Sequence, residues 1–146
     1  VFDPTRRELF TAERGSGARL NGSVINVSAT KCVNDALLCT GFPYDIHETV
    51  HEMMGLFGAM LGRARAIRRL GSAALDLCYV ATGRFDGFWE QRLQPWDMSA
   101  ASLVVEEAGG CLSRFDGTAF DTHDDQIVAS NGLFHDEMVD IINTHG

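Results

Sequence analysis

Hydrophobic and polar positions alternate along this chain in short blocks of two kinds. Short apolar runs and runs that alternate residue by residue are typical of strands, whereas apolar positions spaced three and four residues apart are typical of helices. The first kind predicts strands over residues 8–12, 18–20, 24–27, 35–40, 65–70, 85–90, 111–114 and 126–130. The second kind predicts helices over residues 48–61, 72–82, 97–108 and 134–143.

The order of these elements indicates an α/β fold. Strands and helices that alternate in this way form layers, so we expect an αβα domain with a mixed sheet and helices on both of its faces. A small hairpin region opens the chain, with a tight turn at Asn21-Gly22. The helix over 48–61 is expected to bury one apolar face, made of Val50, Met53, Met54, Phe57, Met60 and Leu61.

The helix over 97–108 begins with a carboxylate. Asp97 is expected to be its N-cap, because Pro95 and Trp96 bar an earlier start, and Gly109-Gly110 ends the helix. Capping alone explains such an aspartate and stabilises a helix by about 1 kcal/mol. The preceding Trp and the small residues 99–101 favour a second role, since Mg2+ requires an oxygen ligand held rigidly in a narrow pocket.

Two further segments could contact a ligand. Gly71, Ser72 and Ala73 open the helix over 72–82, and backbone N–H groups at a helix start suit a phosphate or a hydroxyl group, although small residues are also common at helix–helix contacts. Glu90 ends a strand seven residues before Asp97, where a sheet forms a crevice. Of Arg68 and Arg69, one could reach the pocket or a partner subunit, and the other only solvent.

Other candidates have simpler structural interpretations. Glu106 and Glu107 are interpreted as a solvated helix end, and residues 15–17 (Gly-Ser-Gly) as a hairpin turn, because no strand-then-helix context surrounds them. Asp86-Gly87 is interpreted as a bend in its strand. The histidines are expected on the surface, in loops or on polar helix faces: His47, His51, His123, His135 and His145.

Composition narrows the classes of partner. The chain has 146 residues, 45% of them hydrophobic, which is enough for the core of one domain, and it contains no repeat or linker. Its net charge of −8 arises from 20 acidic and 12 basic residues spread along the chain, so nucleic acid is not an expected partner. No stretch approaches the roughly 20 apolar residues that cross a bilayer, so no membrane is expected either.

The four cysteines form neither a zinc-binding nor a redox motif, because they are far apart in the sequence. Cys39, Cys78 and Cys111 lie in apolar segments typical of reduced, buried thiols, whereas Cys32 does not. Reduced thiols favour a cytoplasmic protein.

Three of these segments, taken in order, resemble the inositol monophosphatase family of Mg2+-dependent, lithium-sensitive sugar phosphatases. The matching stretches are residues 71–74 (Gly-Ser-Ala-Ala), residues 80–90, and residues 96–101 (Trp-Asp-Met-Ser-Ala-Ala) with 106–110 (Glu-Glu-Ala-Gly-Gly). Weaker matches occur at 13–22, 40–44 and 129–131, so the resemblance covers nearly the whole chain.

The resemblance implies that residues 1–146 are the carboxyl-terminal half of such an enzyme. The family's Gly-Glu-Glu and Asp-Pro-x-Asp-Gly-Thr segments, which supply most metal ligands and the threonine that orients the attacking water, are absent; Asp3-Pro4-Thr5 lacks the rest of the pattern. The isolated chain is therefore expected to be inactive and to contain no catalytic residue. The complete enzyme is expected to be a cytoplasmic homodimer.

By the same resemblance, Asp97 is the one Mg2+ ligand that this half supplies, and it also contacts substrate. Gly71, Ser72 and Ala73 line the sugar, and Glu90 accepts hydrogen bonds from ring hydroxyl groups. The implied reaction is hydrolysis of a phosphate monoester of inositol or a related sugar.

Two alternatives remain open. The Trp-Asp core is shared with fructose-1,6-bisphosphatase, 3'-phosphoadenosine nucleotidase and histidinol-phosphatase relatives, although residues 79–90 favour the inositol type. From a different class, the chain could be a non-catalytic binding or regulatory module, a role compatible with bacterial relatives implicated in contacts with the transcription machinery.

Overall fold

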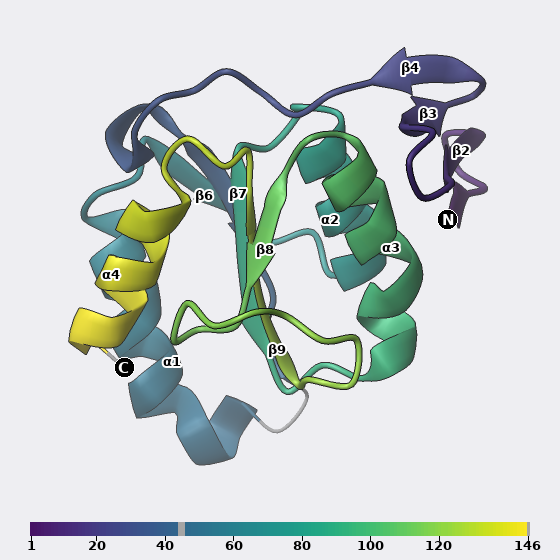
Figure 1. Cartoon of the computed structure of the whole chain (residues 1–146). Helices are drawn as coiled ribbons and strands as arrows, with labels where there is room; N and C mark the ends of the chain where they lie inside the picture. The colour runs from purple at the N-terminus through teal and green to yellow at the C-terminus, as the bar shows by residue number, and fades with distance from the viewer. Residues whose placement is uncertain (44–45, 146) are drawn as a thin grey trace.

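A five-stranded mixed sheet forms the middle layer of the molecule (Figure 1). The computed structural model describes residues 1–43 and 46–145, with the side chains of Glu52 and His145 left aside. The strand order is β6-β5-β7-β9-β8; β5 runs parallel to β6 and β7, and β9 runs antiparallel to β7 and β8. The strands are β5 (Leu37–Thr40), β6 (Ala66–Arg68), β7 (Gly87–Gln91), β8 (Cys111–Ser113) and β9 (Gln126–Ser130).

Two pairs of helices cover the two faces of this sheet, as Figure 1 shows. Helices α1 (Ile46–Leu61) and α4 (His135–His145) lie on one face, and α2 (Ala73–Ala81) and α3 (Pro95–Glu107) lie on the other. The predicted αβα layering and mixed sheet are therefore confirmed. The strand expected over 35–40 is shorter, because residues 33–35 form a turn of 3-10 helix before it.

A second, antiparallel sheet packs against α3 at the edge of the molecule. Its strands are β1 (Phe2–Asp3), β2 (Glu8–Ala12), β3 (Ala18–Leu20) and β4 (Ser23–Ile25). The expected turn at Asn21-Gly22 is confirmed, since both residues have the positive φ that a two-residue hairpin requires. The hairpin interpretation of residues 15–17 is confirmed as well, because they connect β2 to β3.

The central sheet separates two buried clusters. Phe88, Leu77 and Met98 lie in the cluster under α2 and α3, to which Phe10 of the small sheet also contributes. Leu38 and Met60 lie in the cluster under α1 and α4. Sheet residues that point to opposite faces thus supply both cores.

The apolar face predicted for α1 is only partly correct. The buried stripe consists of Met53, Leu56 and Met60, whereas Val50, Met54 and Leu61 are 40 to 51% exposed. The backbone leaves the helical conformation at Thr49, which kinks the helix just before Val50. Met54 and Leu61 each follow a buried residue and lie about 100° farther round the helix, which turns them toward solvent.

Two surface interpretations need correction. His135 is buried, and its ring nitrogens lie 2.9 Å from the Ser130 hydroxyl and 2.8 Å from the Ser113 hydroxyl. Glu107 does not simply face solvent, because its carboxylate accepts hydrogen bonds from the N–H groups of Gly15 and Gly17, both at 2.8 Å. Tertiary partners, which periodicity does not reveal, explain both differences.

Two smaller corrections concern residues at strand ends. The predicted bend is present at Asp86, but it lies directly before β7 and not within the strand; the Asp86 carboxylate accepts hydrogen bonds from the Leu37 N–H at 2.6 Å and the Thr30 hydroxyl at 2.8 Å. Cys39 and Cys78 are buried as expected, but Cys111 is only half-buried. The expectation for the side chain of His145 lies outside the described residues.

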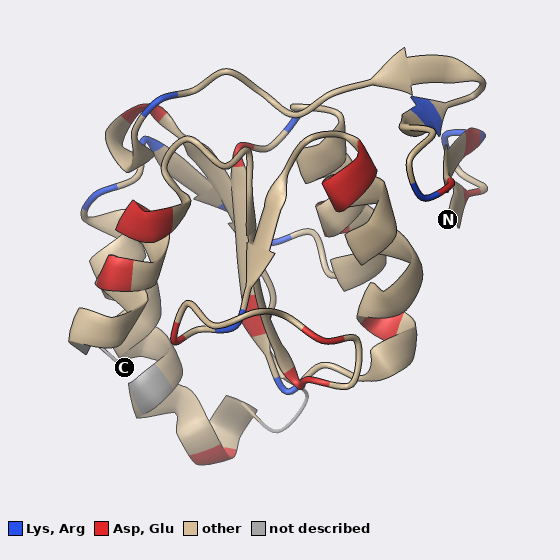
Figure 2. Ribbon diagram, in the orientation of Figure 1, with Lys and Arg blue, Asp and Glu red and all other residues tan. Residues whose placement is uncertain are grey.

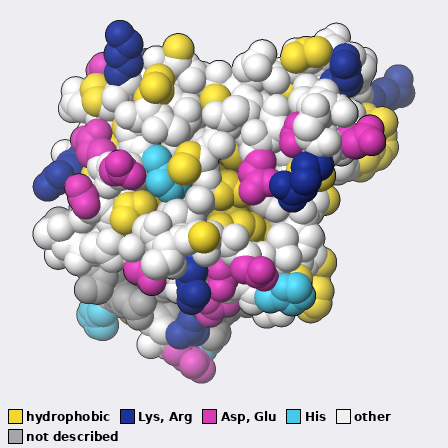
Figure 3. Space-filling view, viewed as in Figure 1, with side chains coloured by type: hydrophobic (Ala, Val, Ile, Leu, Met, Phe, Trp, Pro, Cys, Tyr) yellow, Lys and Arg dark blue, Asp and Glu magenta, His cyan; other side chains and the backbone are white. Residues whose placement is uncertain are grey.

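Acidic and basic residues both occur in many parts of the described chain (Figure 2). Acidic residues occur on helices and in loops (Figure 2), and on the face in Figure 3 their side chains are interspersed with those of Lys and Arg. Among the described helices, none combines the length and the hydrophobicity that crossing a bilayer would take.

Candidate functional site

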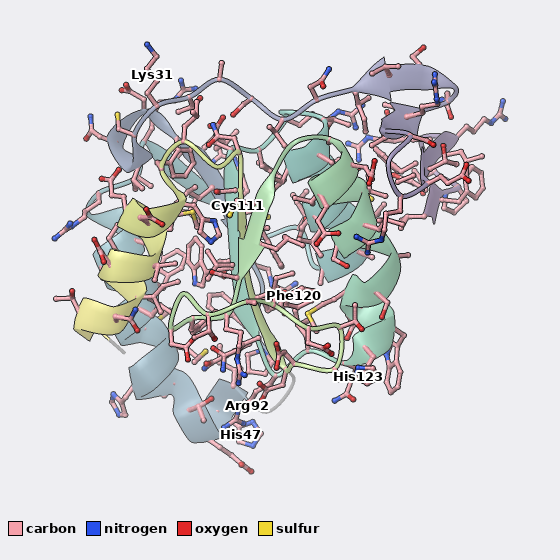
Figure 4. All side chains as sticks on the ribbon, in the orientation of Figure 1. Lys31, His47, Arg92, Cys111, Phe120 and His123 are labelled. Carbon is pink, nitrogen blue, oxygen red and sulfur yellow. The ribbon has the colours of Figure 1, made fainter. Side chains whose placement is uncertain are left out.

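A cavity of about 500 Å³ opens where β5 and β7 end. Four segments contribute to its wall: the residues after β5, those before and at the start of α2, the end of β7 with the loop that follows, and the first turn of α3. Figure 4 shows Arg92 at this end of the sheet, with Cys111 at the distant end of β8. The cavity therefore lies at the carboxyl ends of two parallel strands, where open α/β sheets bind ligands.

Each residue predicted to bind metal or substrate lines this one cavity. They come from three successive elements, α2, β7 and α3: Gly71, Ser72, Ala73, Glu90 and Asp97. The arrangement brings two carboxylates and the amino-terminal end of a helix to a common space.

The start of α3 differs from the prediction. The helix begins at Pro95, its N-cap is Gln94, and Asp97 occupies the third helical position. Proline is favoured in the first turn because the N–H it lacks would have no helical partner there. The Asp97 Oδ2 atom accepts a hydrogen bond from the Gln94 N–H at 2.9 Å, so this carboxylate closes the first turn from inside the helix.

The same carboxylate suits the role of a single metal ligand. Its second oxygen, Oδ1, has no hydrogen-bond donor among residues 1–43 and 46–145, and oxygen ligands are those that Mg2+ prefers. The described side chains contain no group of three or more His, Cys, Asp or Glu residues placed to hold a metal ion. The geometry of Asp97 therefore fits the contribution of one metal ligand.

The start of α2 distinguishes between the two adjacent arginines. Ser72 is the N-cap of α2, and its hydroxyl accepts a hydrogen bond from the Leu75 N–H. Arg69 lines the cavity and lies against Gly71, whose φ of +102° is left-handed. Arg68 is exposed and donates to the carbonyl oxygen of neighbouring Ile67. Arg69 is thus the arginine of this pair at the cavity.

Glu90 lies in an environment that favours its neutral form. Burial raises the pKa of Glu90 to about 7, the carboxylates of Asp76 and Asp97 also raise it, and the Arg69 guanidinium opposes them. A buried or half-buried carboxyl group among other acids holds its proton more tightly, because the charged form loses hydration and meets like charge.

Asp76 is the residue that the sequence interpretation missed. It is fully buried on α2, and neither of its carboxylate oxygens has a hydrogen-bond partner among the described residues. Burial raises the pKa of Asp76 to about 6, an effect that the Cys39 thiol and Arg69 reduce. The available signal was one acidic residue inside the apolar run from Leu75 to Leu77.

The wall of the cavity includes further residues that were not predicted. Gly41 and Pro43 are buried beside it, and Trp96 is 78% exposed at its edge. Arg92 also lines it, with a left-handed φ of 60°. In the sequence, Gly41 and Pro43 belong to the stretch over 40–44, which was one of the weaker matches to the family. Tyr44 of that stretch lies outside the described residues.

Comparison with known proteins gives a consistent assignment. The model of the inositol monophosphatase family matches residues 1–146. The chain is 44% identical over 147 residues to Nus factor SuhB of Pseudomonas aeruginosa, covering 99% of this chain and 54% of that protein. It is 43% identical over 138 residues to Inositol-1-monophosphatase of Synechocystis, covering 94% of this chain and 48% of that protein.

A solved structure agrees with this match. The inositol monophosphatase of Anabaena superposes with a TM-score of 0.95 at 39% identity, over 99% of this chain and 57% of that one. The chain thus spans about half the length of the relatives it matches. With its fold and nearly its full sequence matched, the chain belongs to the inositol monophosphatase family.

Proposed function

We propose that the protein containing this chain is a Mg2+-dependent phosphatase that hydrolyses a phosphate monoester of inositol or a related sugar. The observation that carries this proposal is the convergence of Glu90, Asp97 and the amino-terminal end of α2 on one cavity of about 500 Å³. The name of the Synechocystis relative supports the inositol phosphate class of substrate. The enzyme is proposed to be a cytoplasmic homodimer that lithium inhibits. Neither nucleic acid nor a membrane is a proposed partner.

Within this proposal the chain's own residues mainly bind and orient the substrate. In its ionised form, which a pKa of about 7 keeps partly populated at neutral pH, Glu90 accepts hydrogen bonds from ring hydroxyl groups, and a carboxylate suits this because it can accept from two neighbouring hydroxyls at once. Gly71, Ser72 and Ala73 line the sugar, and their backbone N–H groups at the helix start favour an oxygen-rich ligand.

Asp97 has two tasks in this arrangement. Its Oδ2 atom fixes the first turn of α3 through the Gln94 N–H, which holds the carboxylate in one orientation at the cavity. Oδ1 then faces no competing donor among the described residues and would hold Mg2+. When bound, Mg2+ neutralises phosphate charge and lowers the pKa of the attacking water. Since one carboxylate cannot replace most of the hydration shell of Mg2+, the isolated chain should not turn over substrate.

A direct assay tests the proposal. The complete protein should hydrolyse inositol 1-phosphate in the presence of Mg2+, and fructose 1,6-bisphosphate much more slowly. Preference for fructose 1,6-bisphosphate, a 3'-phosphoadenosine nucleotide or histidinol phosphate would instead assign it to another branch of the superfamily.

A second candidate function is favoured by one observation, the name Nus factor SuhB carried by the Pseudomonas aeruginosa relative. Under this alternative the chain is a non-catalytic binding or regulatory module that keeps the fold. The same assay separates the two, because a module of this kind would show no Mg2+-dependent turnover with any of these esters.

A further inference from the structure

The position of the Glu90 carboxyl group depends on a neighbouring residue without a side chain. Thr40 of β5 is paired in parallel register with Trp89 of β7, so the next residues, Gly41 and Glu90, lie beside each other where the strands end. Equivalent residues on adjacent strands point to the same side of a sheet. A Cβ atom on Gly41 would overlap all three atoms of the Glu90 carboxyl group.

Backbone conformation does not explain this glycine. The φ of Gly41 is not in the left-handed region, so its backbone conformation does not require glycine. The space that Glu90 occupies is what requires glycine here. Gly71, at the other wall of the cavity, differs because its φ of +102° is itself left-handed.

The strand ends are held firmly around this contact. The buried Thr40 hydroxyl donates to the Trp89 carbonyl oxygen at 2.7 Å, directly before Gly41 and Glu90. Glu90 itself lines the cavity, so the open cavity is the space into which a displaced carboxyl group can move.

We propose that Gly41 is a positioning residue that sets where Glu90 meets substrate hydroxyl groups and thereby determines the substrate preference of the cavity. This inference rests on the proposed role of Glu90 in hydroxyl recognition. In this role Gly41 acts through Glu90, because the absence of a Gly41 side chain leaves the space that the Glu90 carboxyl group occupies.

Gly41→Ala in the complete enzyme tests the inference. The obstacle is the far end of a flexible side chain, so the variant should fold and Glu90 should move. Loss of a charge-assisted hydrogen bond corresponds to a fall in kcat/KM for inositol 1-phosphate of about 10- to 100-fold. Hydrolysis of p-nitrophenyl phosphate, which lacks ring hydroxyls, should change far less. An equal loss on both substrates would contradict a positioning role.

Two comparisons isolate the contact. Gly58→Ala is the matched control, because a Cβ at this α1 glycine meets no atom within 4 Å; both activities should stay at the parental level. In a Glu90→Ala background, Gly41→Ala should cause no further loss of preference, since the group it displaces is gone. Additive losses in this double-mutant cycle would overturn the inference.

A structural measurement separates this inference from the proposed function. A crystal structure of the complete Gly41→Ala protein should show the Glu90 carboxyl group displaced into the cavity; an unmoved carboxyl group would refute the inference whatever the activity. If the parent hydrolyses no sugar phosphate, the proposed function fails while this displacement still reports on Gly41. If Gly41→Ala does not fold, Gly41→Ala/Glu90→Ala should fold, and failure of both would also refute the inference.

Discussion

Asp76 shows how one buried carboxyl group can make stability depend on pH. Its pKa of about 6 in the folded protein lies above the value of roughly 4 expected for an unfolded chain, so the folded state binds the proton more tightly. The contribution of this group to stability therefore falls as pH rises from about 4 through 6, and the loss is complete at higher pH.

Asp76→Asn should remove this pH-dependent loss. At pH 8 we expect the variant to be more stable than the parent by on the order of 1–3 kcal/mol, and near pH 4 the two should be similar. Urea unfolding of the complete protein at both pH values measures the difference. A constant difference between parent and variant across this range would show that Asp76 is not buried in its charged form at high pH.

Asp97 combines a helix-capping contact with the proposed metal contact, and Asp97→Asn separates the two. The amide oxygen can still accept the Gln94 N–H, so stability without metal should stay within about 1 kcal/mol of the parent. Activity should fall steeply, because the substitution removes a negative charge from the proposed Mg2+ ligand. Thermal unfolding and Mg2+-dependent turnover give the two values. A large drop in stability together with activity would mean that Asp97 is mainly structural.

At the scale of elements, the end of α3 anchors the β2–β3 hairpin through Glu107. Hydrogen bonds from Gly15 and Gly17 lower the pKa of this carboxyl group, so it stays ionised and remains a good acceptor at neutral pH. Glu107→Ala should speed amide hydrogen exchange at Gly15 and Gly17 while leaving exchange in β7 unchanged. Glu106→Ala is the control, since Glu106 forms a long, solvent-exposed ion pair of 3.7 Å with Arg14. Equal effects of both variants would exclude a specific anchor.

The order of the elements could be predicted from the sequence, but several of their contacts could not. Hydrophobic spacing predicts the αβα layers because each element buries one face. It does not predict that α3 begins at Pro95, because an aspartate can cap a helix either as the N-cap or from the third helical position. It also does not predict the kink of α1 at Thr49. His135 and Glu107 find partners 22 and about 90 residues away, which local patterns cannot reveal.

The candidate site shows the same division between local pattern and tertiary contact. Glu90, Asp97 and Gly71 stand at element ends with recognisable motifs, so the sequence predicts them as candidates, and the structure places them on one cavity. Asp76 and Gly41 depend on which strand and helix lie next to Glu90. The proximity of Asp76 and Gly41 to Glu90 is apparent only in the folded chain.

At the scale of the whole molecule, we propose that recognition and chemistry are divided between two parts of the enzyme. The chain spans about half the length of its relatives and, in its described part, holds no group of three metal-binding side chains. In the proposed enzyme this chain supplies one metal ligand, Asp97, and the substrate contacts of Glu90 and residues 71–73. In this proposal Glu90 recognises substrate hydroxyl groups and Asp97 holds the metal.

Glu90→Gln in the complete enzyme tests this division most directly. The amide can still contact one hydroxyl but loses the charged, two-point acceptor, so kcat/KM for inositol 1-phosphate should fall by an amount equivalent to about 1.5–3 kcal/mol. Turnover of a simple phosphate ester, and the Mg2+ concentration that gives half-maximal activity, should change little. An equal rate loss on every substrate with a shifted Mg2+ requirement would instead assign Glu90 to the metal and contradict the account.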